Sequence, residues 1–452
     1  MGTSTRRKGR EFDVALWLAR HPGAVLLPGS VSASVMQLGA TTTASIAGGA
    51  AAGLLAWYRG HPDSFDTVAA PRFRAWWRRW ASKRYTGIFW RDTLLACDLV
   101  RENRKTQELY VPRIVKIRSF TPSIDTLWVR LVPGQSAKAW IDKTEELADA
   151  LKVERVSVEK VRPQIIALVV QRTESFTEVI DAPDMPTDAE LVDLTALCVG
   201  ETEYGDDFTL GVQGQHVLDA GATGSGKNSL GWSLLRQMAP MIREGSVRVW
   251  GADPKEIELA PGKDAFYRYA ADEESIHEMV SEYHEDLRDT KAKLKAAGLR
   301  KFTPSPETPF NLLLADELGA IVGFGDMTYR KDYRSWFPVI GTQGRATGHG
   351  LLGMVQEPNK DTVPFRDLFT TRLCLRVTAA QHVDMALGDD ARLRGALADE
   401  IPNDPATAGI GYVVRQRSRT PMRIRLSYVD DAEIEEFVRY VTGGPSLRVV
   451  AA

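Results

Sequence analysis

The chain reads Gly221-Ala222-Thr223-Gly224-Ser225-Gly226-Lys227-Asn228 near its middle, and Ser229 follows. This stretch matches the phosphate-binding loop pattern G-x-x-x-x-G-K-[ST] at every specified position except the last, where Asn228 replaces Ser or Thr. Glycines let a backbone turn tightly, so that successive N–H groups point at the oxygens of a polyphosphate. Residues 221–229 are therefore predicted to bind a nucleoside triphosphate, with Lys227 reaching its β- and γ-phosphates.

The residues on either side fit such a loop. Residues 211–220 read as a short strand that leads into it. Residues 229–239 follow with Leu230, Leu234 and Met238 at helical spacing. A strand, a glycine loop and a helix in this order are the context that a phosphate-binding loop requires, and the helix N-terminus adds its dipole to anion binding.

A pair of carboxylates downstream is the second candidate part of the site. Residues 310–315 form an apolar run that is typical of a buried parallel strand, and Asp316 and Glu317 follow it. At the carboxyl end of such a strand, Asp316 can hold Mg²⁺ through water and Glu317 can orient or deprotonate the attacking water. The expected magnesium ligands are Asn228, Ser229 and Asp316.

Four further segments resemble the motifs of one motor family. They are Ala252-Asp253-Pro254-Lys255, Gln343 to Gly348, Val355 to Pro358 and Thr371 to Val377. In this order they resemble motifs of the FtsK/SpoIIIE family of DNA translocases, and the match covers roughly residues 197–428. The resemblance implies that Gln356 senses the γ-phosphate. It also implies that Arg372 approaches the nucleotide of the neighbouring subunit, with Arg345 or Arg376 as alternatives.

A narrower resemblance covers the same motor motifs together with Pro133-Gly134-Gln135 and Gly409 to Tyr412. These segments are similar to the transfer proteins of actinomycete conjugative plasmids and integrative elements. In those relatives a small residue often follows the loop lysine and a serine comes next, which is similar to Asn228-Ser229. The resemblance implies ATP and Mg²⁺ as cofactors, a hexameric ring, double-stranded DNA as partner and a role in conjugal transfer. It also implies other transfer or spread proteins as further partners.

The composition places few limits on the partner. The chain has 452 residues, enough for several domains, and a formal net charge of −2. Because the charge is nearly balanced, any contact with DNA must be local, such as the basic lining of a pore. Cys97, Cys198 and Cys374 have no metal-ligand spacing, and the 7 histidines form no metal-binding pattern. The cysteines fit packing in a reducing compartment.

The N-terminal region predicts a membrane anchor. Residues 22–58 contain no Asp, Glu, Lys or Arg, and about 20 apolar residues suffice to span a bilayer. Gly49 and Gly53 are spaced for close helix packing in lipid, and Trp57-Tyr58 suits the interface. Basic residues flank the run on both sides, which favours two short helices with both ends in the cytoplasm, while a single span remains open. The expected location is the cell membrane, with the motor domain in the cytoplasm.

The segment from Arg72 to Trp80 is rich in arginine and tryptophan. It reads as an interfacial helix on an anionic leaflet. The alternative is a nucleic-acid contact in which the aromatic rings stack on bases. Its position close to the uncharged run favours the membrane.

The predicted fold class is α/β, with a RecA-like P-loop motor on a parallel sheet, a small α+β domain before it and the membrane anchor at the N-terminus. The expected domains are residues 1–91 for the anchor and basic segment, 92–180 for the small domain, 181–196 for a linker and 197–452 for the motor. In the small domain we expect strands at 110–118, 126–132, 153–158 and 164–170 and a helix at 140–151. In the motor we expect strands around Val217, Val247, Leu312, Leu351 and Leu373, and a charged helix at 274–297. No C-terminal winged helix is expected.

The sequence thus predicts an ATPase that moves double-stranded DNA as a membrane-anchored ring. Two alternatives remain open. One is a motor of the same superfamily that moves single-stranded DNA or secreted protein. The other is a nucleotide-binding regulator that Asn228 renders inactive, which the presence of Glu317, Gln356 and Arg372 disfavours.

Overall fold

A computed structural model of the 452-residue chain describes residues 35–80, 85–102, 107–299, 301–324, 326–414 and 420–443. The chain divides into two units, residues 1–74 and residues 75–452. Residues 1–34 lie outside the description, and with them the first part of the uncharged run 22–58.

The first unit is helical where it is described. Helix α3 spans Ala40–Gly60 and helix α4 spans Pro62–Val68. At their junction the indole of Trp57 donates a hydrogen bond to Ser64 Oγ at 2.7 Å and packs edge-on against Phe65. No helix within the described ranges is both long and apolar enough to cross a membrane. The predicted spanning segment is therefore not found in this part of the chain.

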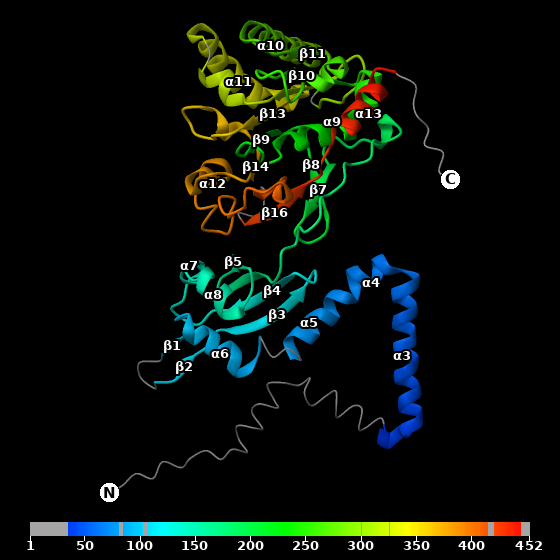
Figure 1. Ribbon diagram of the computed structural model, residues 1–452, viewed down its shortest axis with the longest axis vertical. Helices are drawn as coiled ribbons and strands as arrows, with labels where there is room; N and C mark the ends of the chain where they lie inside the picture. The colour runs from blue at the N-terminus through cyan, green and yellow to red at the C-terminus, as the bar shows by residue number, and fades with distance from the viewer. Residues whose placement is uncertain are drawn as a thin grey trace. The chain divides into compact units, whose positions relative to one another are not determined.

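A small domain in the second unit is built on a four-stranded antiparallel sheet in the order β3-β4-β6-β5. Its strands lie where the alternating pattern predicted them, at β3 Arg113–Ser119, β4 Ile124–Arg130, β5 Arg155–Arg162 and β6 Ile165–Gln171. One face of the sheet is covered by α6 Gly87–Ala96, α7 Ala137–Ile141 and α8 Thr144–Leu151 (Figure 1). The single helix expected at 140–151 is thus two helices. A separate strand pair is formed by β1 Arg101–Glu102 and β2 Leu109–Tyr110.

The core of the small domain begins before the expected boundary at residue 91. Trp90 of α6 is 5% exposed and stacks on the buried Trp140, with 6.5 Å between the ring centroids. Leu94, on the same helix, is fully buried in this cluster. Helix α6 crosses the boundary, so residues on both sides of it contribute to one core.

The tryptophan-rich segment forms helix α5, Ala70–Trp80. One of its arginines, Arg78, forms an ion pair with Asp125 of β4, which is completely buried. Asp125 also accepts hydrogen bonds from the Tyr85 hydroxyl at 2.9 Å and the Ser119 hydroxyl at 2.7 Å. A buried carboxylate needs such partners. Arg78 therefore serves the packing of the small domain, a role that the sequence pattern did not indicate.

The motor domain is built on a ten-stranded sheet in the order β11-β10-β12-β13-β9-β14-β15-β16-β7-β8. The first six strands in this order are parallel. Five of them lie where strands were predicted, at β9 His216–Ala220, β10 Val247–Ala252, β12 Phe310–Ala315, β13 His349–Val355 and β14 Thr371–Leu375. The sixth, β11 Arg268–Ala270, was not predicted. The other four are antiparallel and were not expected, at β7 Leu197–Thr202, β8 Asp207–Leu210, β15 Ile410–Val414 and β16 Pro421–Leu426.

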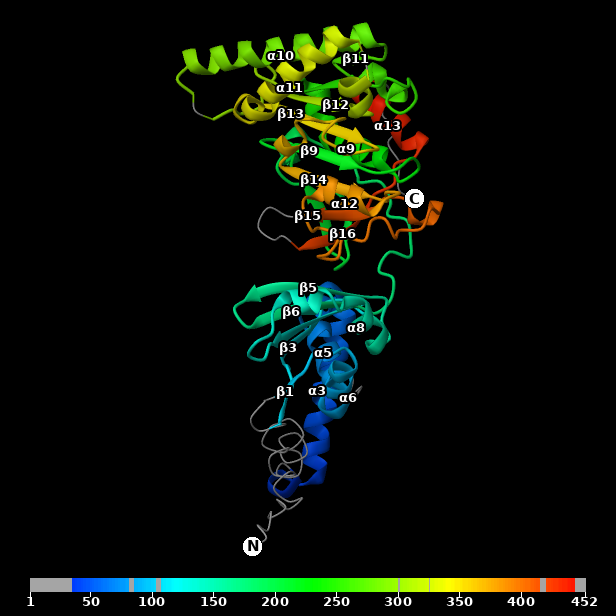
Figure 2. The same ribbon diagram turned by 90° about the vertical axis from the view of Figure 1, so that its left-hand side faces the viewer.

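Helices cover both faces of this sheet (Figures 1 and 2). One face packs against α10 Glu273–Ala296, α11 Met327–Thr347 and α12 Ala380–Leu387. The other packs against α9 Lys227–Glu244 and α13 Asp431–Val441. The other short helical segments in the described part of the chain are Ala189–Leu191, Ala260–Ala265, Ala320–Phe324, Arg366–Leu368 and Pro405–Thr407. The parallel strands end at one edge, which brings the residues that follow them together.

Candidate nucleotide-binding site

The glycine loop lies between β9 and α9, in the predicted strand–loop–helix context. Gly226 has a φ of 91°, a conformation that favours glycine. A Cβ at this position would lie 2.6 Å from the backbone nitrogen of Gly409. Gly409 in turn donates its N–H to the Ser225 carbonyl at 2.8 Å. The loop is thus held against the start of β15, and only glycine fits at the contact.

Lys227 is the first residue of α9, and its ammonium group lies against the loop. Its Nζ donates to the carbonyl oxygens of Gly221 at 2.7 Å and Ala222 at 3.2 Å. Burial lowers the pKa of Lys227, while the negative charges of Asp219 and Glu317 oppose this shift. A cation is therefore positioned where a polyphosphate would meet the backbone N–H groups.

The two carboxylates follow β12 directly. Asp316 is 4% exposed, and its Oδ2 has no hydrogen-bond partner among the residues that the structure describes. Burial and the neighbouring Asp253 raise the pKa of Asp316 to about 6. Glu317 has a φ of 52° and places its carboxylate 3.4 Å from Lys255 Nζ and 3.4 Å from the backbone N–H of Gln356. Glu317 is thus held between the segments that follow β10 and β13.

Gln356 lies at the end of β13, beside the loop. Its Oε1 accepts a hydrogen bond from Thr223 Oγ1 at 3.4 Å. On the other side Arg376 donates to the Thr223 carbonyl at 2.7 Å. The loop is therefore linked to the ends of β13 and β14, the two strands that flank β9.

These residues line one cavity of about 760 Å³. It contains the predicted residues Thr223, Gly224, Ser225, Gly226, Lys227, Asn228, Ser229, Asp316, Glu317 and Gln356. Arg372 and Arg345 are not in its lining. Arg372 instead lies 3.8 Å from Asp367, and Arg345 is exposed on α11.

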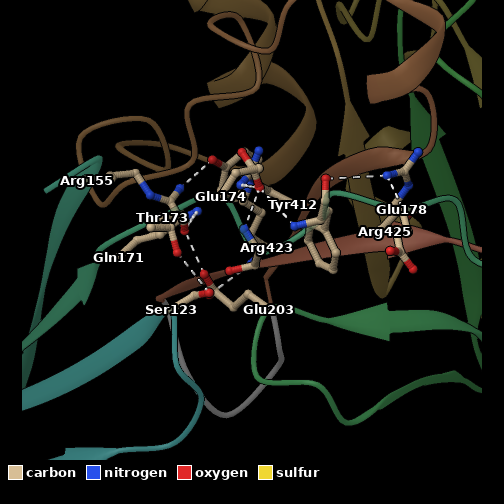
Figure 3. Close-up of polar contacts among 12 residues, drawn as sticks. Ser123, Arg155, Gln171, Thr173, Glu174, Glu178, Glu203, Tyr412, Arg423 and Arg425 are labelled. Atoms are coloured by element: carbon tan, nitrogen blue, oxygen red, sulfur yellow. Dashed lines mark hydrogen bonds and ion pairs between the residues drawn. The ribbon is translucent and has the colours of Figure 1, made fainter.

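Part of the cavity wall was missed by sequence reasoning. It includes Asn403, Asp404, Pro405, Ala408 and Gly409, together with Arg425, Tyr428 and Val179. Arg425 of β16 is 2% exposed and donates to the Ala406 carbonyl at 2.7 Å and to the Glu178 carbonyl at 2.8 Å (Figure 3). One buried guanidinium therefore joins the wall of the cavity to the segment that leaves the small domain. The resemblance at Gly409 to Tyr412 was the one signal in the sequence that pointed to this wall.

A second arginine connects the small domain with the motor. Arg155 of β5 donates to the Gly395 carbonyl at 3.1 Å, to Glu203 at 3.2 Å and to the Tyr412 hydroxyl (Figure 3). Glu203 is 5% exposed and also accepts the backbone N–H of Arg423. Paired buried charges hold these elements in one arrangement, because an unpaired partner would be costly.

The residues present fit a nucleotide with a divalent cation. The loop offers backbone N–H groups and an ammonium group, and Asn228, Ser229 and Asp316 offer oxygen atoms at one end of the cavity. The unpartnered Oδ2 of Asp316 is the observation that favours a cation there.

Asp219 is a buried carboxylate that sequence reasoning did not single out. It lies on β9 just before the loop and is 0% exposed, and neither of its carboxylate oxygens has a partner in the described part of the chain. Burial raises the pKa of Asp219 to about 7, although the charge of Lys227 opposes the shift. The ionised form of Asp219 is therefore costly in the folded motor.

Asp219→Asn is expected to stabilise the motor more at high pH than at low pH. An Asp in an unfolded chain has a pKa of about 3.9, so between that pH and about 7 the folded chain holds the extra proton, and stability is lost as the pH rises through about 7. The asparagine variant lacks this linkage and should gain at most roughly 4 kcal/mol at about pH 8, but only about 1.5 kcal/mol at about pH 5. Urea unfolding at both pH values measures the gain. An equal gain at the two pH values would contradict the assignment.

The fold and the loop are those of P-loop ATPases. A parallel sheet carries the glycine loop after β9, and the carboxylate pair follows β12 at the same edge. The comparisons with known proteins bear out this class.

Residues 67–172 match the family model of the actinomycete conjugal transfer protein N-terminal domain. The chain is 23% identical over 349 residues to the DNA translocase FtsK of Corynebacterium efficiens, covering 70% of this chain and 35% of that protein. It is 22% identical over 340 residues to the DNA translocase SpoIIIE of Bacillus subtilis, covering 68% of this chain and 40% of that protein. The chain thus spans well under half the length of these curated relatives. The predicted resemblance to FtsK/SpoIIIE translocases and actinomycete transfer proteins is confirmed.

A solved structure supports the fold. The structure of the pCW3 conjugation coupling protein TcpA, in monomer form with ATPγS, superposes with a TM-score of 0.50 at 15% identity. The superposition covers 79% of this chain and 99% of that one. Most of this chain therefore has a fold similar to that of a solved structure.

Proposed function

We propose that this chain is an ATP-driven translocase of double-stranded DNA that acts in the conjugal transfer of a plasmid or integrative element. The observation that carries the proposal is the meeting of the glycine loop with Asp316, Glu317 and Gln356 in one cavity. The similarity to DNA translocases over 70% of the chain supports DNA as the substrate, and the match at residues 67–172 supports transfer.

In this proposal the loop residues bind the phosphates of ATP and Lys227 neutralises the charge that develops on them. Glu317 orients the attacking water and accepts its proton, and Gln356 contacts the γ-phosphate. Catalysis of phosphoryl transfer consists mainly of such positioning and charge stabilisation. Release of the phosphate then changes the contact between Gln356 and Thr223, which links the loop to β13.

Mg²⁺ is the cation that this site is proposed to hold, with Asn228, Ser229 and Asp316 as its candidate ligands or ligands to its water shell. It would supply charge neutralisation between the phosphates. The amide oxygen of Asn228 can take the place of the usual hydroxyl as a ligand.

The active assembly is proposed to be a homo-oligomeric ring, with Arg372 acting on the nucleotide of the neighbouring subunit. Arg372 does not line the cavity of its own chain, although its side chain is partly exposed on β14. Arg376 contacts the loop of its own chain, so it has a different role.

The segment after Gln356 is the proposed DNA contact of the motor. Lys360 is exposed, with its Nζ 3.5 Å from Asp367, and the Arg366 guanidinium donates to the Pro358 carbonyl. Because the segment follows the strand that ends at the γ-phosphate position, loss of the phosphate can move it. Lys360 and Arg366 would then bind phosphates of the DNA backbone and make no contact with the bases.

Replacing Lys360 and Arg366 together by alanine is expected to lower the affinity for duplex DNA. The slope of log affinity against log salt should flatten by about 0.9 for each lost phosphate contact. The matched control is Lys331→Ala with Arg334→Ala, which removes two exposed cations from α11. Fluorescence anisotropy with labelled duplex at several salt concentrations measures the slope.

The same proteins test the proposed function as a whole. Duplex DNA is expected to stimulate ATP hydrolysis by the native chain more than single-stranded DNA does. If single-stranded DNA or a partner protein stimulates ATP hydrolysis more strongly, the substrate is not duplex DNA. The chain is then a motor for single-stranded DNA or for secreted protein. A folded oligomer that releases no phosphate with any of them would favour an inactive regulator.

We also propose that the first unit, residues 1–74, brings the motor to the cell membrane, with the motor on the cytoplasmic side. The run 22–58 without charged side chains supports this, as do Arg72 and Arg74 in the first part of α5. Deleting residues 1–74 is expected to move the protein from the membrane fraction to the supernatant with ATP hydrolysis intact. Release of the full-length chain by about 1 M salt alone would leave an electrostatic contact and exclude insertion.

A further inference from the structure

One face of the small-domain sheet is not covered by its helices, and its side chains can be followed row by row from the strand register. At the far end, Arg113 of β3 lies opposite Arg130 of β4, Arg130 lies opposite Ile165 of β6, and Ile165 lies opposite Arg162 of β5. The side chains of residues directly opposite each other point to the same face. Three arginines therefore share one row on one face.

The next two rows continue this pattern. Lys116 lies opposite Trp128, with its ammonium group 4.8 Å from the centre of the indole ring. Arg118 lies opposite Thr126 and stacks on Phe120 at 5.6 Å. Glu159 is the one carboxylate in these rows on the described strands. The opposite face holds the apolar core, which includes Leu127 and Val129.

The cations of this face are exposed, and they are Arg113, Lys116, Arg118, Arg130 and Arg162. None of the five forms an ion pair with Asp or Glu in the part of the chain that the structure describes. Like charges that lie directly opposite each other on a sheet are destabilising. The repulsion between Arg113 and Arg130 thus destabilises the sheet when nothing is bound. A polyanion bound to this face would offset that repulsion.

The fourth row connects the face with the motor. It contains Arg155, which contacts Glu203 and Tyr412 of the motor (Figure 3), and Gln171 lies opposite it. Phe120, under Arg118, packs edge-on against Tyr204 of the motor at 5.4 Å. The cationic rows therefore begin beside the motor contact and run away from it.

We propose that this face of the small domain is a second phosphate-binding surface for duplex DNA, separate from the segment after Gln356. The inference rests on the proposed function, because it takes the substrate of the motor as its occupant. Arginine suits the task, since its planar guanidinium binds phosphate with two parallel hydrogen bonds. A flat face that presents cations without base-reading loops fits contact with the backbone, independent of sequence.

The test compares a triple variant with a matched control. The variant is Arg113→Ala, Arg130→Ala and Arg162→Ala. The control is Arg91→Ala, Lys138→Ala and Lys143→Ala, which removes the same charge from the helix-covered side of the same domain. Binding of a labelled duplex is measured against salt, with DNA-free ATP turnover as the check that each protein is folded. The slope of log affinity against log salt should flatten by up to about 2.7 in the variant and stay as in the native chain in the control.

A charge reversal separates binding from packing. Arg113→Glu creates an opposite-charge pair with Arg130, so its melting temperature should equal or exceed that of the native chain, while its duplex affinity falls at least tenfold. If the duplex affinity falls only in proportion to the melting temperature in all variants, the proposal is overturned.

The remaining outcomes are also decisive. An unchanged salt slope in the triple variant, with a native chain that binds duplex, overturns this inference and leaves the proposed function standing. If the native chain does not bind duplex DNA, both this inference and the proposed function are wrong. If the triple variant keeps its duplex binding but no longer binds phosphatidylserine vesicles, the surface is a lipid contact and the proposal is wrong.

Discussion

Lys227→Ala is expected to lower the DNA-stimulated rate of ATP hydrolysis by at least about 100-fold. Lys227 is the cation that lies against the loop, where its Nζ is 2.7 Å from the Gly221 carbonyl. When ATP displaces this contact, the ammonium group stabilises charge that develops during transfer of the phosphoryl group. Steady-state phosphate release by purified oligomer with saturating duplex measures the effect.

A matched control tests whether the loss is specific. Lys263 is exposed on the turn Ala260–Ala265, and Lys263→Ala removes the same charge from the same domain. Its turnover should remain within about twofold of the native rate, since the charge of an exposed side chain is screened by salt. Substantial turnover by the Lys227 variant would mean that the loop does not hold the reacting nucleotide.

A mixture of two inactive proteins is expected to recover activity if Arg372 acts between subunits. Arg372→Ala alone should lower turnover by roughly 10³-fold or more, as expected for an arginine finger supplied in trans. Glu317→Gln alone removes the proposed base of its own cavity. In mixed rings some interfaces combine an intact Glu317 with an intact Arg372, so phosphate release should exceed the sum of the two separate variants.

Arg376 provides the internal control for this experiment. It donates to the carbonyl of Thr223 in its own chain, and Thr223 lines the same cavity as Glu317. A mixture of Arg376→Ala with Glu317→Gln contains no cavity in which both are intact and should show no recovery. Recovery in this mixture, or none with Arg372→Ala, would contradict the assignment in trans.

The sequence predicted the parts of the site that are local. The loop from Gly221 to Ser229 and the pair Asp316-Glu317 are each contiguous, and each follows a strand whose apolar residues mark it. Their meeting followed from the geometry of parallel strands, whose carboxyl ends share an edge. Residue types and spacing were therefore sufficient to predict the loop, the carboxylate pair and their proximity.

The parts that were missed depend on contacts between distant segments. Arg425 reads as one of several exposed charges on an alternating strand, and only its burial against residues 178 and 406 reveals its role. The antiparallel half of the sheet pairs β7 with β16, strands more than 200 residues apart, which no local pattern encodes. Arg78 was grouped with its basic neighbours, because the carboxylate that it meets, Asp125, lies in a strand that reads as apolar.

The contacts of Arg425 determine where a stable fragment of this chain can begin. A fragment starting at Leu197, the expected first residue of the motor, would lack the Glu178 carbonyl that this guanidinium contacts at 2.8 Å. It would also lack Glu174, the ion-pair partner of Arg423. Leaving such buried donors unpaired costs roughly 1–3 kcal/mol each, a large part of the stability of an ordinary domain. The smallest piece that folds as the motor therefore starts ahead of Glu174, close to the end of β6 and inside the range expected for the small domain.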